Sequence, residues 1–388
     1  MLLQLYDSVY GEAAHEQLSH MSSSSLSFDL RERRFASARG VREAIRTEGI
    51  NPKQTFLVCH GLSVRHLRFI RQGGDWAGIW WIGLGWDYYP LLVRRYFELL
   101  RPKTLRSLPR AALLTFTAGQ GLTQGFRDVA SLLFSLVLYS KPYRREIMRQ
   151  LGGCYFSPGL GVEYNLLPPE IRDQLNYLPW TYGVSLDHAS REDLWDKKRR
   201  VNSIVLGNSG TLEGNHLDAI QWLCNSKASV TLTIPIERGD PGVIALVERT
   251  ASAKLPNGSV RFVKKKMSRE QFLRLLTAHE FYVSGHRRQQ GAGTLKMAIT
   301  AGCTPVLDFD NPLAHDMLMR GFNMVSLTHF EESLKLPLGL RGLALSSEEK
   351  AWNVQQMKRH FSPDSLEPIS SEESILHIQS QVRKASNE

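Results

Sequence analysis

The sequence HRRQQGAGTLKMAITAGCTPVLDFDNP, from His286 to Pro312, carries the most informative pattern in this chain. Glycines at 291 and 293 predict a tight loop in which the backbone approaches a neighbour closely. A helix is then expected over Thr294–Ala301, and a short apolar strand over Thr304–Leu307. This succession of loop, helix and strand is typical of an open α/β sheet.

The loop before the helix favours an anionic ligand. Free backbone amides at the start of a helix attract phosphate groups. Arg287, Arg288, Gln289 and Gln290 precede that start, and their side chains can donate hydrogen bonds to a pyrophosphate or a sugar hydroxyl. Asn311 turns the chain at the carboxyl end of the strand, where open α/β sheets bind ligands. A βα turn without a ligand is the alternative that these residues alone leave open.

A second glycine turn lies about eighty residues earlier. A strand is predicted over Val201–Leu206, and it runs into Gly207, Asn208 and Ser209 before a helix over His216–Cys224. The turn lacks the full GxGxxG pattern, and it is no P-loop because no lysine follows it. Together the two turns predict two phosphate-binding helix starts at one sheet edge. Further strands are expected at Val230–Ile234, Val260–Lys264 and Glu280–Ser284.

These motifs resemble those of a known family. LGNSG with Asn215 and His216 after it, RQQGAGTL, the strand AG-x-x-PVL, NP and Asp316-Met317 occur in this order. Over about residues 200–320 the chain resembles the bacterial transferases that move 4-acetamido-4,6-dideoxygalactose from its dTDP-sugar to a polyprenyl-diphosphate-linked disaccharide in enterobacterial common antigen assembly. The resemblance thins in the amino-terminal half to Phe56–Gly61 and to Gly85, Asp87 and Tyr89.

The resemblance implies an α/β protein of GT-B architecture, in which two Rossmann-like domains face a central cleft. It implies an inverting transfer that uses no metal and no cofactor, with the donor nucleotide held by the second domain. The donor-binding residues expected on this basis are Gly207, Asn208, Ser209, Arg288, Gln289, Gln290, Gly291, Gly293, Thr294 and Asn311. The chain departs from the family at Asp7–Gly11 and Pro179–Ser185, which leaves the acceptor and the donor sugar open.

An inverting transfer needs a base for the acceptor hydroxyl. Asp87 ranks first, His60 second and Glu163 third, because they are predicted at strand ends or after a glycine turn facing the cleft. A histidine directly after a strand is also often a hydrogen-bonded structural residue, and this alternative stays open for His60. Asp308-Phe309-Asp310 has the form of a DxD metal motif, but we interpret it as a surface turn.

Length and composition agree with two domains. A chain of 388 residues is too long for one ordinary domain, and we expect an acceptor domain over 1–190, a donor domain over 200–345 and helices with a polar tail over 346–388. The net charge of +10 and the pI near 9.5 suit an acidic partner such as a nucleotide sugar, a lipid diphosphate or an anionic membrane. Four scattered cysteines without a CxxC pair indicate a reduced, cytoplasmic protein.

The partners expected are a nucleotide-sugar donor, a lipid-linked saccharide acceptor and the cytoplasmic face of the inner membrane, to which the enzyme attaches peripherally. No apolar run approaches about 18 residues, the length that spans a bilayer. The aromatic cluster Trp76–Tyr89 lines an acceptor cleft or meets lipid headgroups, or else Trp80 and Trp81 are core residues. The apolar stretch Val129–Tyr139 is a surface-seeking segment or a buried helix.

Two other classes of function remain as alternatives. A nucleic-acid-binding protein would explain the charge, but the sequence has no zinc, RNP or helix-turn-helix pattern and its basic residues are dispersed. An inactive GT-B scaffold would keep the fold and the ligand while losing turnover.

Overall fold

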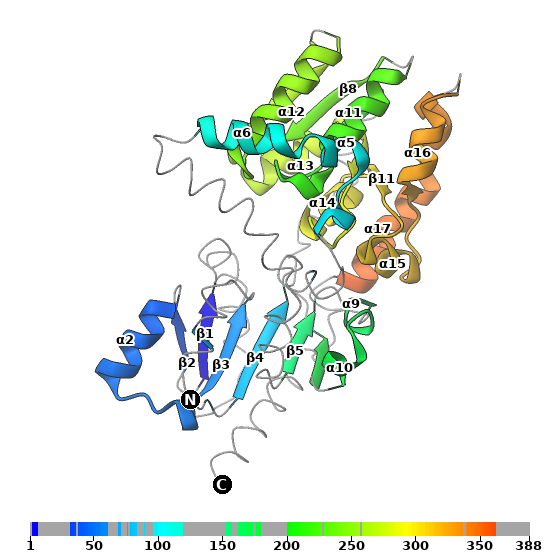
Figure 1. Cartoon of the computed structure of the whole chain (residues 1–388). Coiled ribbons are helices and arrows are strands. Elements are labelled where there is room, and N and C mark those ends of the chain that lie inside the picture. Colours follow the sequence, from blue (N-terminus) through cyan, green and yellow to red (C-terminus); the bar gives the residue numbers. More distant parts are fainter. Residues whose placement is uncertain are drawn as a thin grey trace. The chain divides into compact units, whose positions relative to one another are not determined.

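The computed structural model shows two compact units, each built on a parallel six-stranded sheet (Figure 1). It describes residues 2–6, 32–35, 38–60, 69–70, 76, 78–83, 89, 96–118, 153–156, 162–173, 176–179, 200–226, 229–256, 258–336 and 339–361. The first unit comprises residues 1–94, 138–183 and 366–388, and the second comprises 95–137 and 184–365.

The sheet of the first unit has the order β2-β1-β3-β4-β5-β6, with every neighbouring pair parallel. The bounds are β1 Leu2–Tyr6, β2 Glu32–Phe35, β3 Phe56–His60, β4 Gly78–Gly83, β5 Gly153–Phe156 and β6 Asn176–Pro179. Leu57, Cys59 and Trp81 are completely buried, as expected for apolar strands covered on both faces. Trp81 is therefore a core residue, which agrees with the core alternative for the aromatic cluster.

The helices of the first unit that the structure describes are short, apart from one. They are α2 Ala38–Glu48, α9 Val162–Asn165 and α10 Pro169–Arg172, with a 3-10 turn η1 at Pro52–Gln54. Helix α2 packs against β1 and β2, and its Val41 is completely buried. The apolar stretch Val129–Tyr139, the turn Asp7–Gly11 and the segment Trp86–Tyr88 lie outside the described residues.

The sheet of the second unit is doubly wound. Its order is β12-β11-β10-β7-β8-β9, with bounds β7 Arg200–Leu206, β8 Thr231–Pro235, β9 Val260–Val263, β10 His279–Ser284, β11 Thr304–Leu307 and β12 Val325–Ser326. The strands predicted for this region are confirmed to within one residue at each end. The direction of winding reverses between the neighbours β7 and β10, which is the place where folds of this kind bind their ligands.

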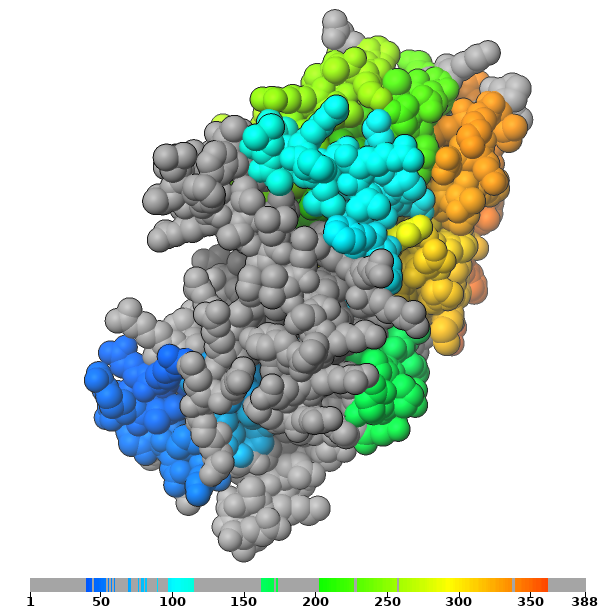
Figure 2. Space-filling model, viewed as in Figure 1, coloured from blue at the N-terminus to red at the C-terminus, as the bar shows by residue number. Residues whose placement is uncertain are grey.

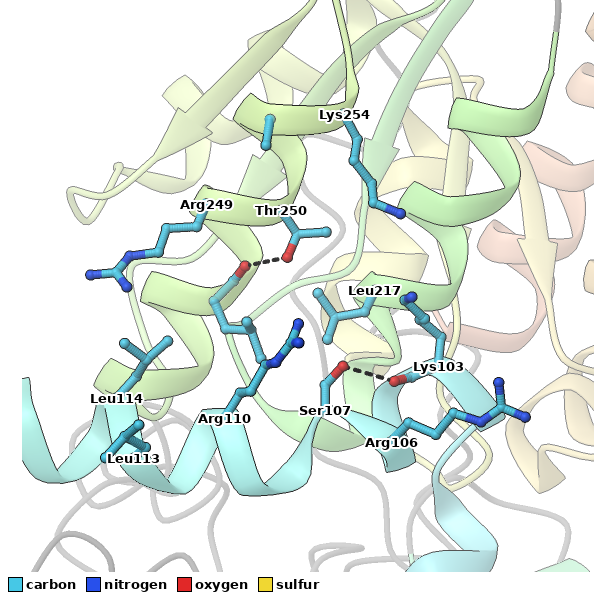
Figure 3. A pocket seen from close by; sticks show the side chains of 12 residues that line it. Lys103, Arg106, Ser107, Arg110, Leu113, Leu114, Leu217, Arg249, Thr250 and Lys254 are labelled. Carbon is cyan, nitrogen blue, oxygen red and sulfur yellow. Dashed lines mark hydrogen bonds between the residues drawn. The ribbon is translucent and has the colours of Figure 1, made fainter.

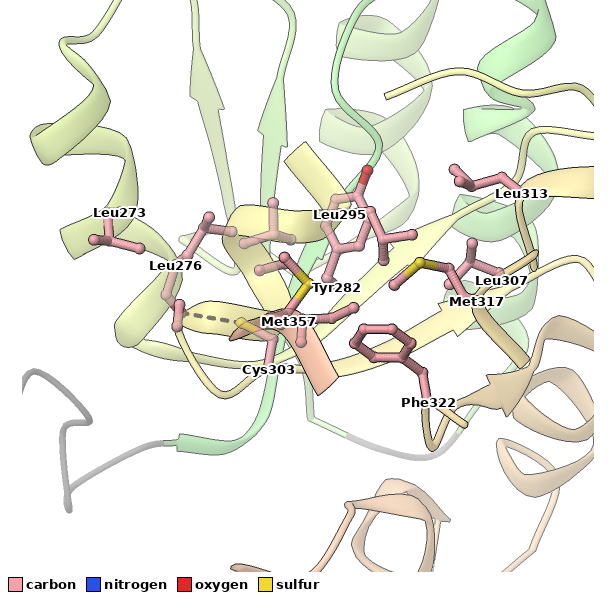
Figure 4. Close-up of a cluster of buried hydrophobic side chains, with 14 of the residues drawn as sticks. Leu273, Leu276, Tyr282, Leu295, Cys303, Leu307, Leu313, Met317, Phe322 and Met357 are labelled. Atoms are coloured by element: carbon pink, nitrogen blue, oxygen red, sulfur yellow. Dashed lines mark hydrogen bonds between the residues drawn. The ribbon is translucent and has the colours of Figure 1, made fainter. Parts of the chain in front are cut away.

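Helices cover this sheet and build its core (Figures 1 and 4). They are α5 Pro102–Arg106, α6 Leu108–Ala118, α11 His216–Asn225, α12 Pro241–Lys254, α13 Arg269–Thr277, α14 Ala292–Thr300, α15 Pro312–Met319, α16 Leu327–Ser333 and α17 Ser347–Phe361, with 3-10 turns η2 Tyr96–Leu99, η4 Leu212–Gly214 and η5 Gly339–Leu343. Figure 4 shows Leu295 of α14 and Met357 of α17 in one apolar cluster with Tyr282 of β10. This cluster fixes α14, whose first turn follows the glycine loop.

The predicted domain boundaries need two corrections. Residues 96–118 pack on the second unit instead of belonging to a continuous domain over 1–190, because two side chains of the second unit bind them. Asn215 accepts a hydrogen bond from the Arg101 amide (2.8 Å). The Asp218 carboxylate accepts from the amides of Lys103 and Thr104 (2.9 Å each) and so caps the short helix α5. Helix α6 then lies along α12.

The second correction concerns the carboxyl-terminal segment. The predicted separate region over 346–388 begins with α17, which packs on α14 within the second unit. Asn353 of α17 also exchanges two hydrogen bonds with the backbone of Asn323, at 2.7 and 2.8 Å. The α17 helix is thus part of the second unit, and the polar tail after residue 361 lies outside the described residues.

Candidate functional site

The two glycine turns meet at the switch point of the second sheet. One turn follows β7 and the other follows β10. The Gln290 side chain donates a hydrogen bond from Nε2 to Ser209 Oγ (3.0 Å). A Cβ atom added to Gly291 would lie 2.9 Å from the amide carbon of Asn208, so only glycine allows this approach. The predicted convergence of the turns near 208 and 291 is therefore confirmed.

The start of α14 is open. Its N-cap, Gly291, has a φ of +73° and no side chain to bind the first amides. A Cβ atom at Gly293 would meet nothing within 4 Å. Amides that a helix leaves without partners in its first turn bind anions, helped by the positive end of the helix dipole. The expected helix Thr294–Ala301 is thus present as α14, with its first turn available to a phosphate.

Several buried polar atoms around the two turns have no hydrogen-bond partner among the described residues. They are Asn208 Oδ1, Gln290 Oε1, both ring nitrogens of His216 and Nε2 of His286. Buried polar groups in proteins are almost always satisfied, so these atoms are available to hydrogen-bond a ligand or solvent. The atoms offer both acceptors and a donor for the ribose, base or sugar hydroxyls of a bound nucleotide.

His216 begins α11 and is held by two glycines. A Cβ atom on Gly207 would lie 2.5 Å from its Nε2, and one on Gly214 would lie 2.4 Å from its Cε1. Complete burial lowers the pKa of His216 to about 4. The ring is therefore neutral near pH 7, with one nitrogen a donor and the other an acceptor.

His286 lies on the opposite turn. Ser284 Oγ and His286 Nδ1 are 3.0 Å apart, and His286 is completely buried. Burial, followed by the charges of Arg288 and His216, lowers its pKa well below the ordinary value. Both histidines stand in the sequence motifs, but the motifs predict no role for them. Their position beside the two glycine turns was the available signal.

Arg288 is the buried cation of the site. Its side chain is 8% exposed, and Nη2 lies 3.8 Å from Glu213 Oε1, which is a loose ion pair. Asn311 supports the same loop, since its Nδ2 donates to the carbonyls of His286 (3.0 Å) and Arg288 (2.9 Å). Asn311 Oδ1 accepts from the Leu313 amide (2.9 Å) as the N-cap of α15. Its amide is engaged with backbone, so we assign it to positioning the loop, and its predicted direct contact with the donor stays a prediction.

Arg287 and Asp308 correct two expectations. Arg287 does not point freely to a phosphate: its Nη1 donates to the Glu98 carbonyl (3.2 Å), and its Nε lies 3.4 Å from Asp308 Oδ2. Asp308 is buried and not part of a surface turn, because Arg101 Nη2 also lies 2.6 Å from Oδ2. Among the described residues no group of three or more acidic, histidine or cysteine side chains could hold a metal.

The candidates for the base lie in the first unit. His60 ends β3, and its side chain is not among those described. Glu163 is buried in α9. Asp87 lies outside the described residues. The choice of base stays a prediction for all three.

The fold and this site define a glycosyltransferase of GT-B fold, and comparison with known proteins agrees. A model of the family described as 4-alpha-L-fucosyltransferase glycosyl transferase group 56 matches residues 132–335, more than half of the chain. The chain belongs to this family. Membership favours a glycosyltransferase over the nucleic-acid-binding alternative.

Solved structures show the same fold at low sequence identity. Sucrose-phosphate synthase from Thermosynechococcus elongatus superposes with a TM-score of 0.57 and 10% identity over 98% of each chain. A glycosyltransferase from Rickettsia africae gives a TM-score of 0.53 and 11% identity over 99% of this chain and 98% of that one. TarM gives 0.53 and 10% identity over 88% of this chain, which spans 57% of the length of TarM. These likenesses show the GT-B fold alone.

Proposed function

We propose that this glycosyltransferase moves a 4-acetamido-4,6-dideoxyhexose or a related sugar from a dTDP- or UDP-sugar to a lipid-linked glycan. The donor class rests on one observation: two glycine turns at the switch point of the second sheet place an open helix start beside a group of unpartnered buried polar atoms. A nucleoside diphosphate has the anionic and the hydrogen-bonding parts that such a site takes. The family description names fucose, which like the proposed sugar is a 6-deoxyhexose.

The proposed reaction forms one bond and breaks one. An acceptor hydroxyl attacks the anomeric carbon from the face opposite the diphosphate, while a base removes the hydroxyl proton. The bond between the anomeric carbon and the diphosphate oxygen breaks, and the electron pair leaves with the nucleoside diphosphate. Arg288 and the amides of α14 would stabilise the charge that develops there. Asp87, His60 and Glu163 remain the candidates for the base.

The protein's own groups would supply this stabilisation without a metal. Asp308, the first acid of the DxD sequence, already pairs with Arg101 and Arg287. A cation at this carboxylate would have to displace two arginines. The transfer we propose is therefore metal-independent, with arginine and helix amides in the place of a divalent ion.

Peripheral attachment to the cytoplasmic face of the inner membrane completes the proposal. Its support is the net charge of +10 and the lipid-linked acceptor that the reaction would need. No helix in the described part of the chain is long and apolar enough to cross a membrane.

A thermal-shift panel of dTDP-, UDP- and GDP-sugars tests the donor assignment. A ligand that binds only the folded state raises the melting temperature. We expect dTDP- or UDP-sugars to stabilise the wild type, and Arg288→Ala and Gln290→Ala to lose that stabilisation. Arg274→Ala is the matched control, since Arg274 is an exposed residue of α13. No shift with any nucleotide, or equal shifts in Arg288→Ala and the control, would refute the donor site.

Turnover separates an enzyme from a scaffold that only binds. Release of dTDP or UDP in the presence of a lipid-linked disaccharide would establish transfer. Nucleotide binding without any release, across acceptors of this class, would support the scaffold.

A further inference from the structure

The second unit has a pocket that shares no residue with the two glycine turns (Figure 3). Its volume is about 630 Å³, and it lies between α5 and α6 on one side and α11 and α12 on the other. We call it the basic pocket. It is lined by Lys103, Arg106, Ser107, Arg110, Leu113, Leu114, Leu217, Leu246, Arg249, Thr250, Ala253 and Lys254. In Figure 2 the segment 96–118 that forms one wall lies on the visible surface beside α12.

Five of the lining residues are cations, and none is an acid. Among the residues that the structure describes, no carboxylate forms an ion pair with any of the five. Figure 3 shows Lys103 and Arg110 extending toward the space beside Leu217, whereas Arg106 and Arg249 extend away from it. The Lys254 ammonium donates to the side-chain oxygen of Gln221, which directs it along α11. Five cations around the basic pocket without an ion-pair partner among the described residues favour an anionic group there.

Apart from the hydroxyl residues Ser107 and Thr250, the rest of the lining is apolar. Leu217 and Leu246 are buried in the floor of the basic pocket. Leu113, on the rim, leaves 63% of its surface exposed. An apolar floor and an exposed leucine beside cations match a ligand that is anionic at one end and apolar at the other.

The sequence makes this arrangement through helix spacing and one cap. Lys103 and Arg106 come from α5 and Arg110 comes from α6, so both helices bring cations to the basic pocket. Leu246, Thr250 and Lys254 repeat at four residues along the facing side of α12. Asp218 fixes the start of α5 by binding its first amides, so the segment has a defined orientation against α11.

We infer that the basic pocket binds the phosphodiester headgroup of an anionic phospholipid in the membrane, with Leu113 entering the acyl layer. Charge complementarity and the apolar rim argue for a lipid over a nucleic acid, whose backbone offers no apolar end. This inference makes the proposal of peripheral membrane attachment more specific, and it rests on that proposal. It assigns that attachment to the second unit, on residues that take no part in the donor site.

Vesicle sedimentation tests the inference directly. The full-length protein is mixed with phosphatidylcholine vesicles that contain or lack phosphatidylglycerol. We expect binding only with phosphatidylglycerol, and a loss of about tenfold or more in apparent affinity for the double variant Arg110→Glu with Lys254→Glu. Lys265→Glu with Lys266→Glu is the matched control, because it makes the same charge change at exposed residues outside the pocket. The apparent affinity of the control for these vesicles should fall less than about threefold, which is the loss expected when only the net charge of the protein decreases.

Leu113→Ser and two soluble competitors complete the experiment. Leu113→Ser should weaken vesicle binding while leaving the charge unchanged. Full competition by inorganic phosphate would show a site for free phosphate and overturn the lipid assignment. A duplex oligonucleotide that depends on Arg110 and Lys254 more than the vesicles do would overturn it in favour of nucleic acid.

The remaining outcomes distinguish this inference from the proposed function. Equal losses in the pocket variant and the control would overturn the pocket while leaving general membrane attachment in place. A wild type that binds no vesicles would refute both. The nucleotide thermal shift should be the same in the pocket variant and the wild type, so the donor proposal stands or falls separately.

Discussion

Gly291 and Asn208 are in contact across the switch point of the second sheet, and the contact requires a glycine. A Cβ atom at residue 291 would lie 2.9 Å from both Cγ and Nδ2 of Asn208. The backbone φ of +73° is a second barrier to any side chain. The distance between the two turns, and so the width of the proposed donor site, depends on this pair.

Gly291→Ala should therefore separate the turns. We expect the affinity for the donor nucleotide to fall about tenfold or more, since the left-handed conformation alone costs about 1–2 kcal/mol for a residue with a Cβ. Isothermal titration with dTDP measures the loss. Gly258→Ala is the control, because Gly258 has a similar φ of +79° but meets nothing within 4 Å. Equal affinity losses in the two variants would contradict the role of the contact.

Gly293→Ala should change stability and binding in opposite directions. A Cβ atom at residue 293 meets nothing in the structure, and alanine favours the helix over glycine by about 1 kcal/mol. The melting temperature of the free protein should rise. The added methyl group would stand where we place the donor phosphates, so dTDP affinity should fall. A variant that binds dTDP as well as the wild type would move the phosphates away from the start of α14.

The second sheet and its two glycine turns could be predicted because their signals are local. β7 and β10 contain the apolar runs 204–206 and 281–283, and the turns after these two strands need glycine for the positive φ at Gly207 and Gly291. The doubly wound order then brings the two turns together without further information. Local pattern and global topology agree in this part of the chain.

Other features could not be predicted because they depend on contacts between distant residues. The capping of α5 by Asp218 joins residues more than a hundred positions apart. The burial of Asp308 likewise depends on Arg101, which stands in a segment that was predicted to belong to the first domain. Nothing near Asp308 in the sequence distinguishes an ion-paired acid from a surface turn.

Asp308→Asn tests the assignment of that acid. Breaking a buried ion pair leaves an uncompensated charge, and we expect the second unit to lose about 3 kcal/mol of its free energy of unfolding. Arg101→Met should cost a similar amount, and the double variant should cost less than the sum of the two. Chemical denaturation of the four proteins measures the coupling.

A chelator provides the matching measurement for metal use. With Asp308 engaged by two arginines, EDTA should leave the initial rate of transfer unchanged. A loss of rate that Mg²⁺ or Mn²⁺ restores would contradict the metal-independent proposal. In the denaturation experiment, additive losses of stability in the double variant Asp308→Asn with Arg101→Met would contradict the ion pair between these two residues.

Gly207→Ala and its combination with His216→Ala form another cycle. The Cβ atom at residue 207 would lie 2.5 Å from His216 Nε2, while the φ of +71° adds backbone strain. We expect Gly207→Ala alone to destabilise the second unit by more than about 2 kcal/mol. Removing the imidazole should recover the part due to the clash and leave the part due to strain. Double-variant stability equal to the sum of the single losses would show that the ring does not occupy this space.

His216 also predicts how stability depends on pH. Its pKa is about 4 in the folded protein and 6.5 without burial, so the unfolded chain binds a proton in that interval and the folded one does not. The contribution of the neutral ring is complete above pH 6.5 and is lost as the pH falls toward 4. From these two pKa values, the free energy of unfolding of the second unit should fall by about 2 kcal/mol between pH 7 and pH 5. His286, whose pKa burial also lowers, adds a loss of the same sign.

Hydrogen–deuterium exchange of peptides from β7 and β10, corrected for the intrinsic rate, measures this loss in the second unit itself. His216→Gln should reduce the pH dependence, because glutamine does not titrate. His315→Gln is the control, since His315 is exposed on α15 and the variant should keep the wild-type dependence. Bound dTDP should increase the protection of these peptides at pH 5, because a nucleotide that fills the site binds only the folded state. A wild type whose second unit is equally protected at pH 7 and pH 5 would mean that His216 is charged or solvated in solution, and that the space between Gly207 and Gly214 is open to water.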